Sequence, residues 1–61
     1  MTRSQIIEQI NSVLSRAGRD RIALYLHAET IRDIRNMRQL TTDQVIDLGW
    51  EIHHTLIDLI R

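Results

Sequence analysis

Hydrophobic and polar residues first alternate at a helical spacing. Between residues 6 and 17 the apolar side chains fall on one broad face, with most polar residues elsewhere. Thr2 and Gln5 stand three residues apart just before this face, which is the spacing of a capping box. Gly18 follows it, where a glycine with positive φ commonly ends a helix. Residues 1–19 therefore predict an N-terminal amphipathic helix and a turn.

The next apolar segment, residues 21–26, has a period of two and favours a short strand. One face of that strand would hold Ile22, Leu24 and Leu26, and the other Arg21, Ala23 and Tyr25. The competing interpretation is a helix from residue 20 to residue 38, because alanine and leucine are good helix formers. It would place Leu24 in line with later apolar residues but leave Ile22 and Leu26 on neighbouring faces. The strand accounts for all three residues, so we prefer it to the three-helix alternative.

After residue 26 the apolar period becomes helical again. Ile31, Ile34 and Met37 recur at three-residue steps and predict a second helix, and Thr41 opens a long last helix that runs to residue 60. This helix carries too many apolar positions for one narrow stripe, so it must be covered on more than one side. Gly49 in its middle costs about 1 kcal/mol relative to alanine. We attribute this glycine to the close approach of two helices at a dimer axis.

A single strand implies a second copy of the chain. One strand cannot satisfy its own backbone hydrogen bonds, and the sequence offers no second strand. A chain of 61 residues also buries only about 60% of its unfolded surface, which makes a monomer marginal. Both points predict a homodimer with antiparallel strand pairing, and higher assembly stays open. The predicted dimer interface consists of Ile22, Leu24, Leu26, Ile46, Gly49, Trp50 and His53.

Residues 20–61 resemble the ribbon-helix-helix DNA-binding proteins of the MetJ and Arc type. The resemblance rests on three features: the alternation at residues 21–26, the helix from residue 29 to residue 37, and residues 40–49. This last segment begins with Leu-Thr-Thr-x-Gln-Val-Ile and ends with Gly49. Within that family the chain looks most similar to the N-terminal domain of the conjugation regulator TraM. The expected fold is mainly α: a ribbon-helix-helix domain with an extra N-terminal helix and one short strand per chain.

The resemblance implies a sequence-specific DNA-binding regulator, such as a transcriptional repressor or a plasmid or phage regulatory protein. Its dimer would insert a two-stranded ribbon into the major groove of double-stranded DNA at an operator. Arg21, Ala23 and Tyr25 would then face the bases. Arg19 would contact phosphate beside the ribbon. Thr41 and Thr42 would hold a phosphate at a helix N-terminus.

The charge balance changes this picture in part. Eight basic residues offset eight acidic ones, which argues against binding nucleic acid by bulk charge alone. All the basic residues are arginine, whose planar fork suits guanine and phosphate, and half of them lie within the first 21 residues. The chain has no cysteine, no apolar run long enough for a bilayer and no signal-peptide pattern. We therefore expect a cytoplasmic protein without a membrane partner.

Catalytic and metal-binding patterns are not evident in the sequence. His53 and His54 are adjacent and so point to different faces of a helix, which rules them out as a metal-binding pair on their own. No Gly-rich phosphate loop or nucleophile paired with histidine is recognisable. We expect neither an enzyme nor a cofactor. The alternative to a DNA-binding regulator is a small all-helical protein-interaction adaptor or inhibitor that uses the N-terminal helix and the Trp50 face.

Overall fold

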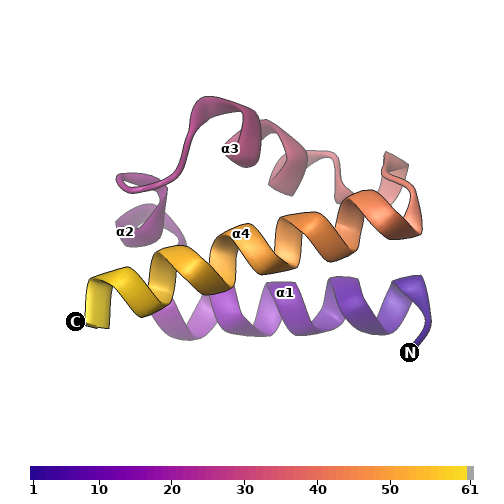
Figure 1. Ribbon diagram of the computed structural model, residues 1–61, viewed down its shortest axis with the longest axis horizontal. Coiled ribbons are helices and arrows are strands. Elements are labelled where there is room, and N and C mark those ends of the chain that lie inside the picture. Colours follow the sequence, from indigo (N-terminus) through magenta and orange to yellow (C-terminus); the bar gives the residue numbers. More distant parts are fainter. Residues whose placement is uncertain (61) are drawn as a thin grey trace.

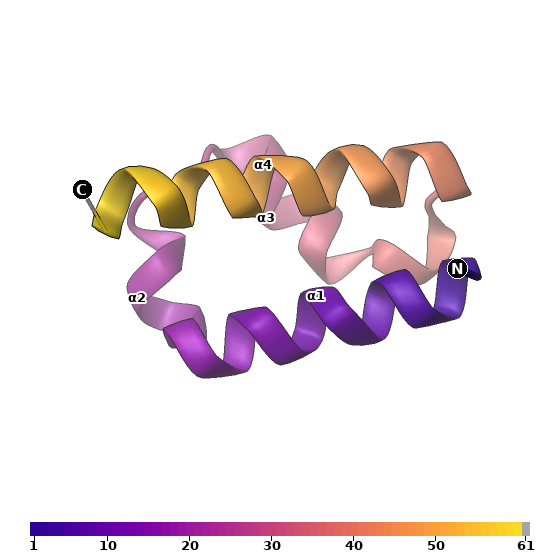
Figure 2. The ribbon, with the colours of Figure 1, turned by 60° about the horizontal axis from the view of Figure 1, so that its bottom comes forward.

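Helices make up nearly all the regular structure of this chain. The computed structural model describes residues 1–60, and within that range it contains no strand. The elements are α1 (Arg3–Ala17), α2 (Arg19–Ala23), α3 (Ala28–Arg35), the 3-10 helix η1 (Met37–Gln39) and α4 (Thr42–Ile60). The two long helices α1 and α4 lie side by side and run in the same direction (Figures 1 and 2). The segment with α2, α3 and η1 leads the chain back from the end of α1 to the start of α4.

Both long helices begin at the predicted capping boxes. The Thr2 hydroxyl accepts a hydrogen bond from the Gln5 N–H at 3.2 Å, and the Gln5 side chain accepts one from the Thr2 N–H at 2.8 Å. Thr41 and Gln44 repeat this arrangement at the start of α4, with distances of 3.2 and 2.9 Å. Gly18 ends α1 with a φ of +86°, a conformation that favours glycine. These local signals were therefore interpreted correctly.

The predicted strand at residues 21–26 is wrong, and with it the ribbon-helix-helix fold and the antiparallel strand pairing. These residues form the end of α2 and a turn, although the broader prediction of a mainly α protein is confirmed. Ile22 is 2% exposed whereas Leu24 is 80% exposed, so the two do not share a face. In a helical turn, residues 22 and 26 lie on the same side and residue 24 lies opposite. Alternation over so short a segment thus fitted a helical turn equally well.

The competing prediction of one helix from residue 20 to residue 38 is also not what the chain forms. The helix stops after Ala23, and His27 has an extended backbone with φ −68° and ψ 153° before α3 begins. Thr30, in the first turn of α3, is buried, and its hydroxyl donates to Glu51 Oε2 at 2.6 Å. This hydrogen bond ties α3 to the middle of α4.

One hydrophobic core contains side chains from both predicted segments, the N-terminal helix and turn at residues 1–19 and the domain at residues 20–61. Its buried apolar side chains are Ile10, Leu14, Ile22, Met37, Val45, Leu48 and Ile52. They come from α1, α2, η1 and α4, so each of these helices needs the others to bury its apolar side chains. Within residues 1–60, neither α4 nor any shorter helix has the length and apolar character needed to cross a membrane.

Arg3 holds the start of α1 against the connection that leads into α4. Its Nε donates to the Leu40 carbonyl at 2.8 Å, and its Nη2 donates to the Met37 carbonyl at 3.3 Å and to the Arg38 carbonyl. Carbonyl groups at the end of a helix have no partner within that helix, and a cation suits them. One half-buried guanidinium therefore caps η1 and fixes residues more than thirty positions away.

The helical turn at residues 19–26 can be tested with a matched pair of truncations. Ile22→Ala should lower the free energy of unfolding by about 2–5 kcal/mol, because it opens a cavity in the core. Leu24→Ala should change it by no more than about 0.5 kcal/mol, because that side chain is exposed. Urea unfolding followed by circular dichroism measures both. Equal losses for the two variants would instead indicate a strand with both residues on its buried face.

The capping role of Arg3 makes a second prediction. Arg3→Ala should lower the free energy of unfolding by about 1–3 kcal/mol, since three carbonyl groups lose a charged donor. Arg35→Ala, which removes an exposed arginine from the last turn of α3, is the control and should have an effect below about 0.5 kcal/mol. Thermal and urea unfolding give the comparison. Similar stabilities for the two variants would exclude a structural role for Arg3.

Candidate functional site

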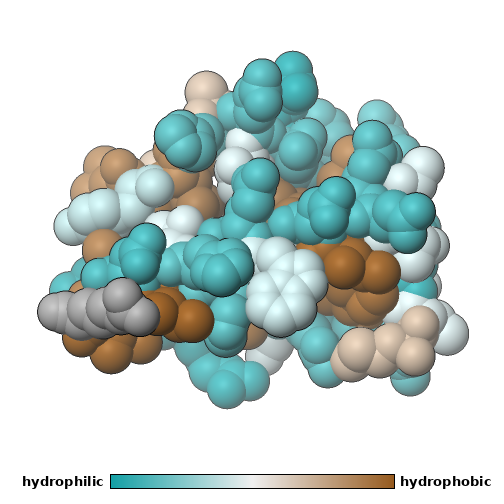
Figure 3. Space-filling model, in the orientation of Figure 1, coloured by the Kyte–Doolittle hydropathy of each residue, from teal (hydrophilic) through white to brown (hydrophobic). Residues whose placement is uncertain are grey.

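An open apolar groove lies between the first halves of α1 and α4, and we call it the α1/α4 groove. Met1, Ile6 and Gln9 line its N-terminal side. Thr42, Ile46, Gly49, Trp50 and His53 line its α4 side. Its volume is about 500 Å³. Figure 3 shows hydrophobic atoms gathered on this face over the first half of α4, between more polar surroundings.

Large hydrophobic side chains stand exposed around the groove. Trp50 is 58% exposed, Met1 77% and Ile46 39%. Single exposed apolar residues are common, but several that share one hollow are typical of an interaction surface. The Trp50 ring is flanked by two imidazoles from the following turn, His53 edge-on and His54 tilted, each with its ring centroid 5.9 Å away. The indole is thus held by neighbours on its own helix while much of it stays open to solvent.

Gly49 forms the floor of the groove at the contact between α4 and α1. A Cβ added there would lie 3.7 Å from Ile10 Cδ1, which is an ordinary van der Waals distance. Its backbone is helical, and Gly18 is the one residue with positive φ among those described. Neither the backbone nor the neighbouring helix therefore requires a glycine at position 49. Gly49 is half-buried and lines the groove next to Trp50, so it fills less of the groove than any other residue would.

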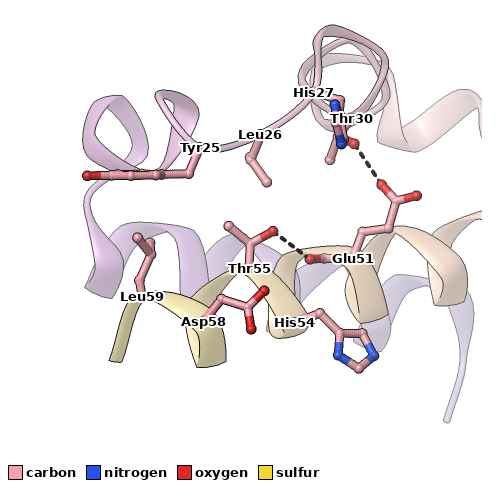
Figure 4. A pocket seen from close by; sticks show the side chains of 9 residues that line it. All are labelled: Tyr25, Leu26, His27, Thr30, Glu51, His54, Thr55, Asp58 and Leu59. Carbon is pink, nitrogen blue, oxygen red and sulfur yellow. Dashed lines mark hydrogen bonds between the residues drawn. The ribbon is translucent and has the colours of Figure 1, made fainter. Parts of the chain in front are cut away.

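A second hollow of about 510 Å³ lies between the turn at residues 24–27 and the second half of α4 (Figure 4). Two hydrogen bonds to Glu51 shape it: Thr30 donates to the carboxylate, and Thr55 donates to the backbone carbonyl at 2.9 Å. The Tyr25 hydroxyl and the His54 ring point away from these groups. Within residues 1–60, no three histidine, aspartate or glutamate side chains are placed to hold a metal ion. This hollow brings no nucleophile and base together.

The residues predicted to contact DNA do not form one surface within a single chain. Arg19, Arg21, Ala23 and Tyr25 lie on α2 and the turn after it, at one end of the molecule, and Thr41 and Thr42 lie at the other end (Figure 1). The longest dimension is 30 Å. Arg19 donates to Asn11 Oδ1 at 2.7 Å, and the Thr41 hydroxyl accepts the Gln44 N–H as a helix cap. Arg21 and Tyr25 are exposed, and Ala23 is half-buried.

The residues predicted for the dimer interface fall into two separate groups. Ile46, Gly49, Trp50 and His53 all line the α1/α4 groove, as expected of one continuous face of α4. The other three belonged to the predicted strand and have different surroundings. Ile22 is buried in the chain's own core, Leu26 packs against that core, and Leu24 is exposed.

The groove also contains residues that were not predicted for the dimer interface. Met1, Ile6, Gln9 and Thr42 complete its lining, although Thr42 had been assigned to phosphate. The apolar face of residues 6–17 was recognised, but its division between the core and an open groove was not. That division depends on where α4 crosses α1, which no local pattern reveals.

Comparisons of the chain with protein-family models, with curated proteins and with solved structures find no match. DNA binding and a protein-interaction role both stay predictions, and only the ribbon through which DNA binding was expected is excluded by the fold.

Proposed function

We propose that this chain is a small helical protein-interaction module, an adaptor or an inhibitor, that binds the apolar face of a helix in the α1/α4 groove. The observation that carries this proposal is the exposure of Trp50, Ile46 and Met1 around one apolar hollow. Tryptophan is strongly enriched among the residues that contribute most to protein–protein binding. An apolar hollow between two helices suits the helix-in-groove mode of recognition.

The surroundings of the groove support such a role. Its walls are the two longest helices of the chain, so a partner would meet a surface that is already ordered, and little conformational entropy would be lost on binding. Gln9, Thr42 and His53 add polar groups to its mostly apolar lining. Protein interfaces commonly combine apolar contacts with polar groups of this kind.

Fewer observations favour double-stranded DNA as the partner. Several arginine side chains already make hydrogen bonds within the chain: Arg3 to backbone carbonyls, Arg16 to Ser12 and Arg19 to Asn11. The net charge is zero. A protein that holds DNA through phosphate contacts needs basic side chains gathered on one face.

The proposed function can be tested with a synthetic amphipathic helical peptide that carries leucine at positions i, i+3, i+4 and i+7. Binding should bury Trp50, the only tryptophan, and shift its fluorescence to shorter wavelength. Ile46→Glu should weaken binding at least about tenfold, equivalent to about 1.4 kcal/mol. A carboxylate in the groove would have to lose water without a partner.

Leu24→Glu is the matched control, because it also replaces an exposed apolar residue by glutamate but lies outside the groove. It should leave peptide affinity unchanged. Equal weakening by both substitutions, or no peptide binding up to millimolar concentration, would contradict the proposal. Titration with a random duplex at low salt forms a parallel arm, and tight, salt-dependent binding there would favour the DNA-binding alternative instead.

A further inference from the structure

The helix that best fits the α1/α4 groove is one that this chain itself supplies. Resting on the function proposed above, we infer that α4 of a second copy occupies the groove, in an antiparallel pair whose two-fold axis passes between Gly49 and Trp50. Each copy then places its Trp50 in the space above Gly49 of the other. Four observations carry this inference: the spacing of the open residues, the glycine next to the tryptophan, the flanking charges and the exposed area.

The open stripe of α4 is symmetric about the point between residues 49 and 50. It consists of Thr42, Ile46, Gly49, Trp50, His53 and Ile57. The numbers of residues between successive members are the same whether they are counted from Thr42 or from Ile57. All six lie on one side of the helix, since steps of three and four residues return to the same face. An antiparallel pair would set Ile46 against His53 and Thr42 against Ile57 of the second copy. A two-fold interface requires this kind of self-complementary surface.

Gly49 and Trp50 provide the complementary shapes at the centre. Glycine is a poor helix former, and nothing in the chain's own backbone or in its contact with Ile10 demands it. Beside it stands the largest side chain of the protein, 58% exposed. When the pair forms, each indole fills the space that the missing side chain leaves on the other copy. Both unexplained features are thereby accounted for together.

The charges beside the stripe favour the antiparallel direction. Asp43, Asp47 and His54 are exposed and lie on one flank of α4, at spacings of four and seven residues. About the proposed axis, His54 of each copy comes between Asp43 and Asp47 of the other. In a parallel pair the same flanks would lie on opposite sides of the interface, so His54 would not meet these aspartates, and complementary polar groups are what select direction and register in such interfaces. The helix dipoles also oppose each other in the antiparallel pair.

The solvent-exposed area of the whole chain is larger than expected for a compact monomer of its mass. The chain exposes 4765 Å² at a mass of 7.2 kDa, whereas a compact monomer of that mass exposes roughly 4,100 Å². The excess of about 650 Å² is close to the about 800 Å² that each partner buries in a standard stable interface. The chain therefore exposes more surface than a compact monomer of its mass, by an amount of the order that one partner buries in a dimer.

Gly49→Ala separates pairing from folding, because it should affect them in opposite directions. The added methyl group meets Ile10 at an ordinary distance and improves helix propensity. The melting temperature at concentrations where the chain is monomeric should therefore rise by several degrees. In the pair, the same methyl group takes the space of the indole, so the dimer dissociation constant from sedimentation equilibrium should increase about tenfold or more. Leu24→Ala, outside the interface, should leave that constant unchanged.

Cysteine cross-linking tests the register, and the native chain has no cysteine to interfere. The double variant I46C/H53C should form a covalent dimer under mild oxidation, because the two positions oppose each other across the axis. The mismatched variant I46C/I57C should not. Within one helix these positions lie roughly 10 Å or more apart, too far for an internal disulfide.

The two proposals can fail separately. A wild-type chain that stays monomeric at millimolar concentration while the synthetic peptide still binds would overturn self-pairing and leave the interaction module intact. Cross-linking that is equally efficient in the matched and mismatched variants would overturn the antiparallel register. Dimerisation with the expected cross-link, together with a peptide that does not compete for the groove, would support self-pairing and exclude the binding of foreign helices there.

Discussion

The parallel packing of α1 against α4 determines the path that the chain between them must take. Two parallel helices cannot be joined by a short turn, because the chain must return from the end of the first to the start of the second. A helix of 15 residues is about 22 Å long, so residues 18–41 have to cover that distance. They do so with short helices, and Arg3 fixes the end of the return path to the start of α1.

This return path also explains why a groove exists. Residues 18–41 cover one flank of the α1/α4 pair and supply Ile22 and Met37 to the core. None of the helices within residues 1–60 covers the opposite flank, where the α1/α4 groove lies open. Because α4 is apolar on more sides than the rest of the chain covers, side chains such as Ile46 and Trp50 stay at the surface there. The groove is therefore a consequence of the topology, and any molecule that covers it completes the burial that the chain begins.

What could be predicted from the sequence was whatever depends on local interactions. The capping boxes at Thr2 and Thr41 and the long last helix involve residues within one turn of each other. The turn around Ile22 was missed because its alternation fits a strand and a helical turn alike, and only the core decides between them. The contacts of Arg3 join residues more than thirty positions apart, so no local sequence pattern could predict them. In the groove, the α4 residues were identified because that helix is too apolar for one partner, whereas the α1 residues depend on the crossing of the two helices.

Self-pairing and the binding of a foreign helix would use the same surface, which has a consequence for function. The two events exclude each other, so the apparent affinity for a foreign helix falls as the chain's own concentration rises. The same linkage stabilises the fold, since a partner that binds only the folded chain shifts the folding equilibrium toward it. A core with only seven buried apolar side chains among the described residues gains proportionally more from that shift than the core of a larger domain would. In the pair that we propose, the indole of Trp50 leaves the solvent beside Gly49 of the second copy, and the burial of this exposed apolar surface would stabilise the assembly.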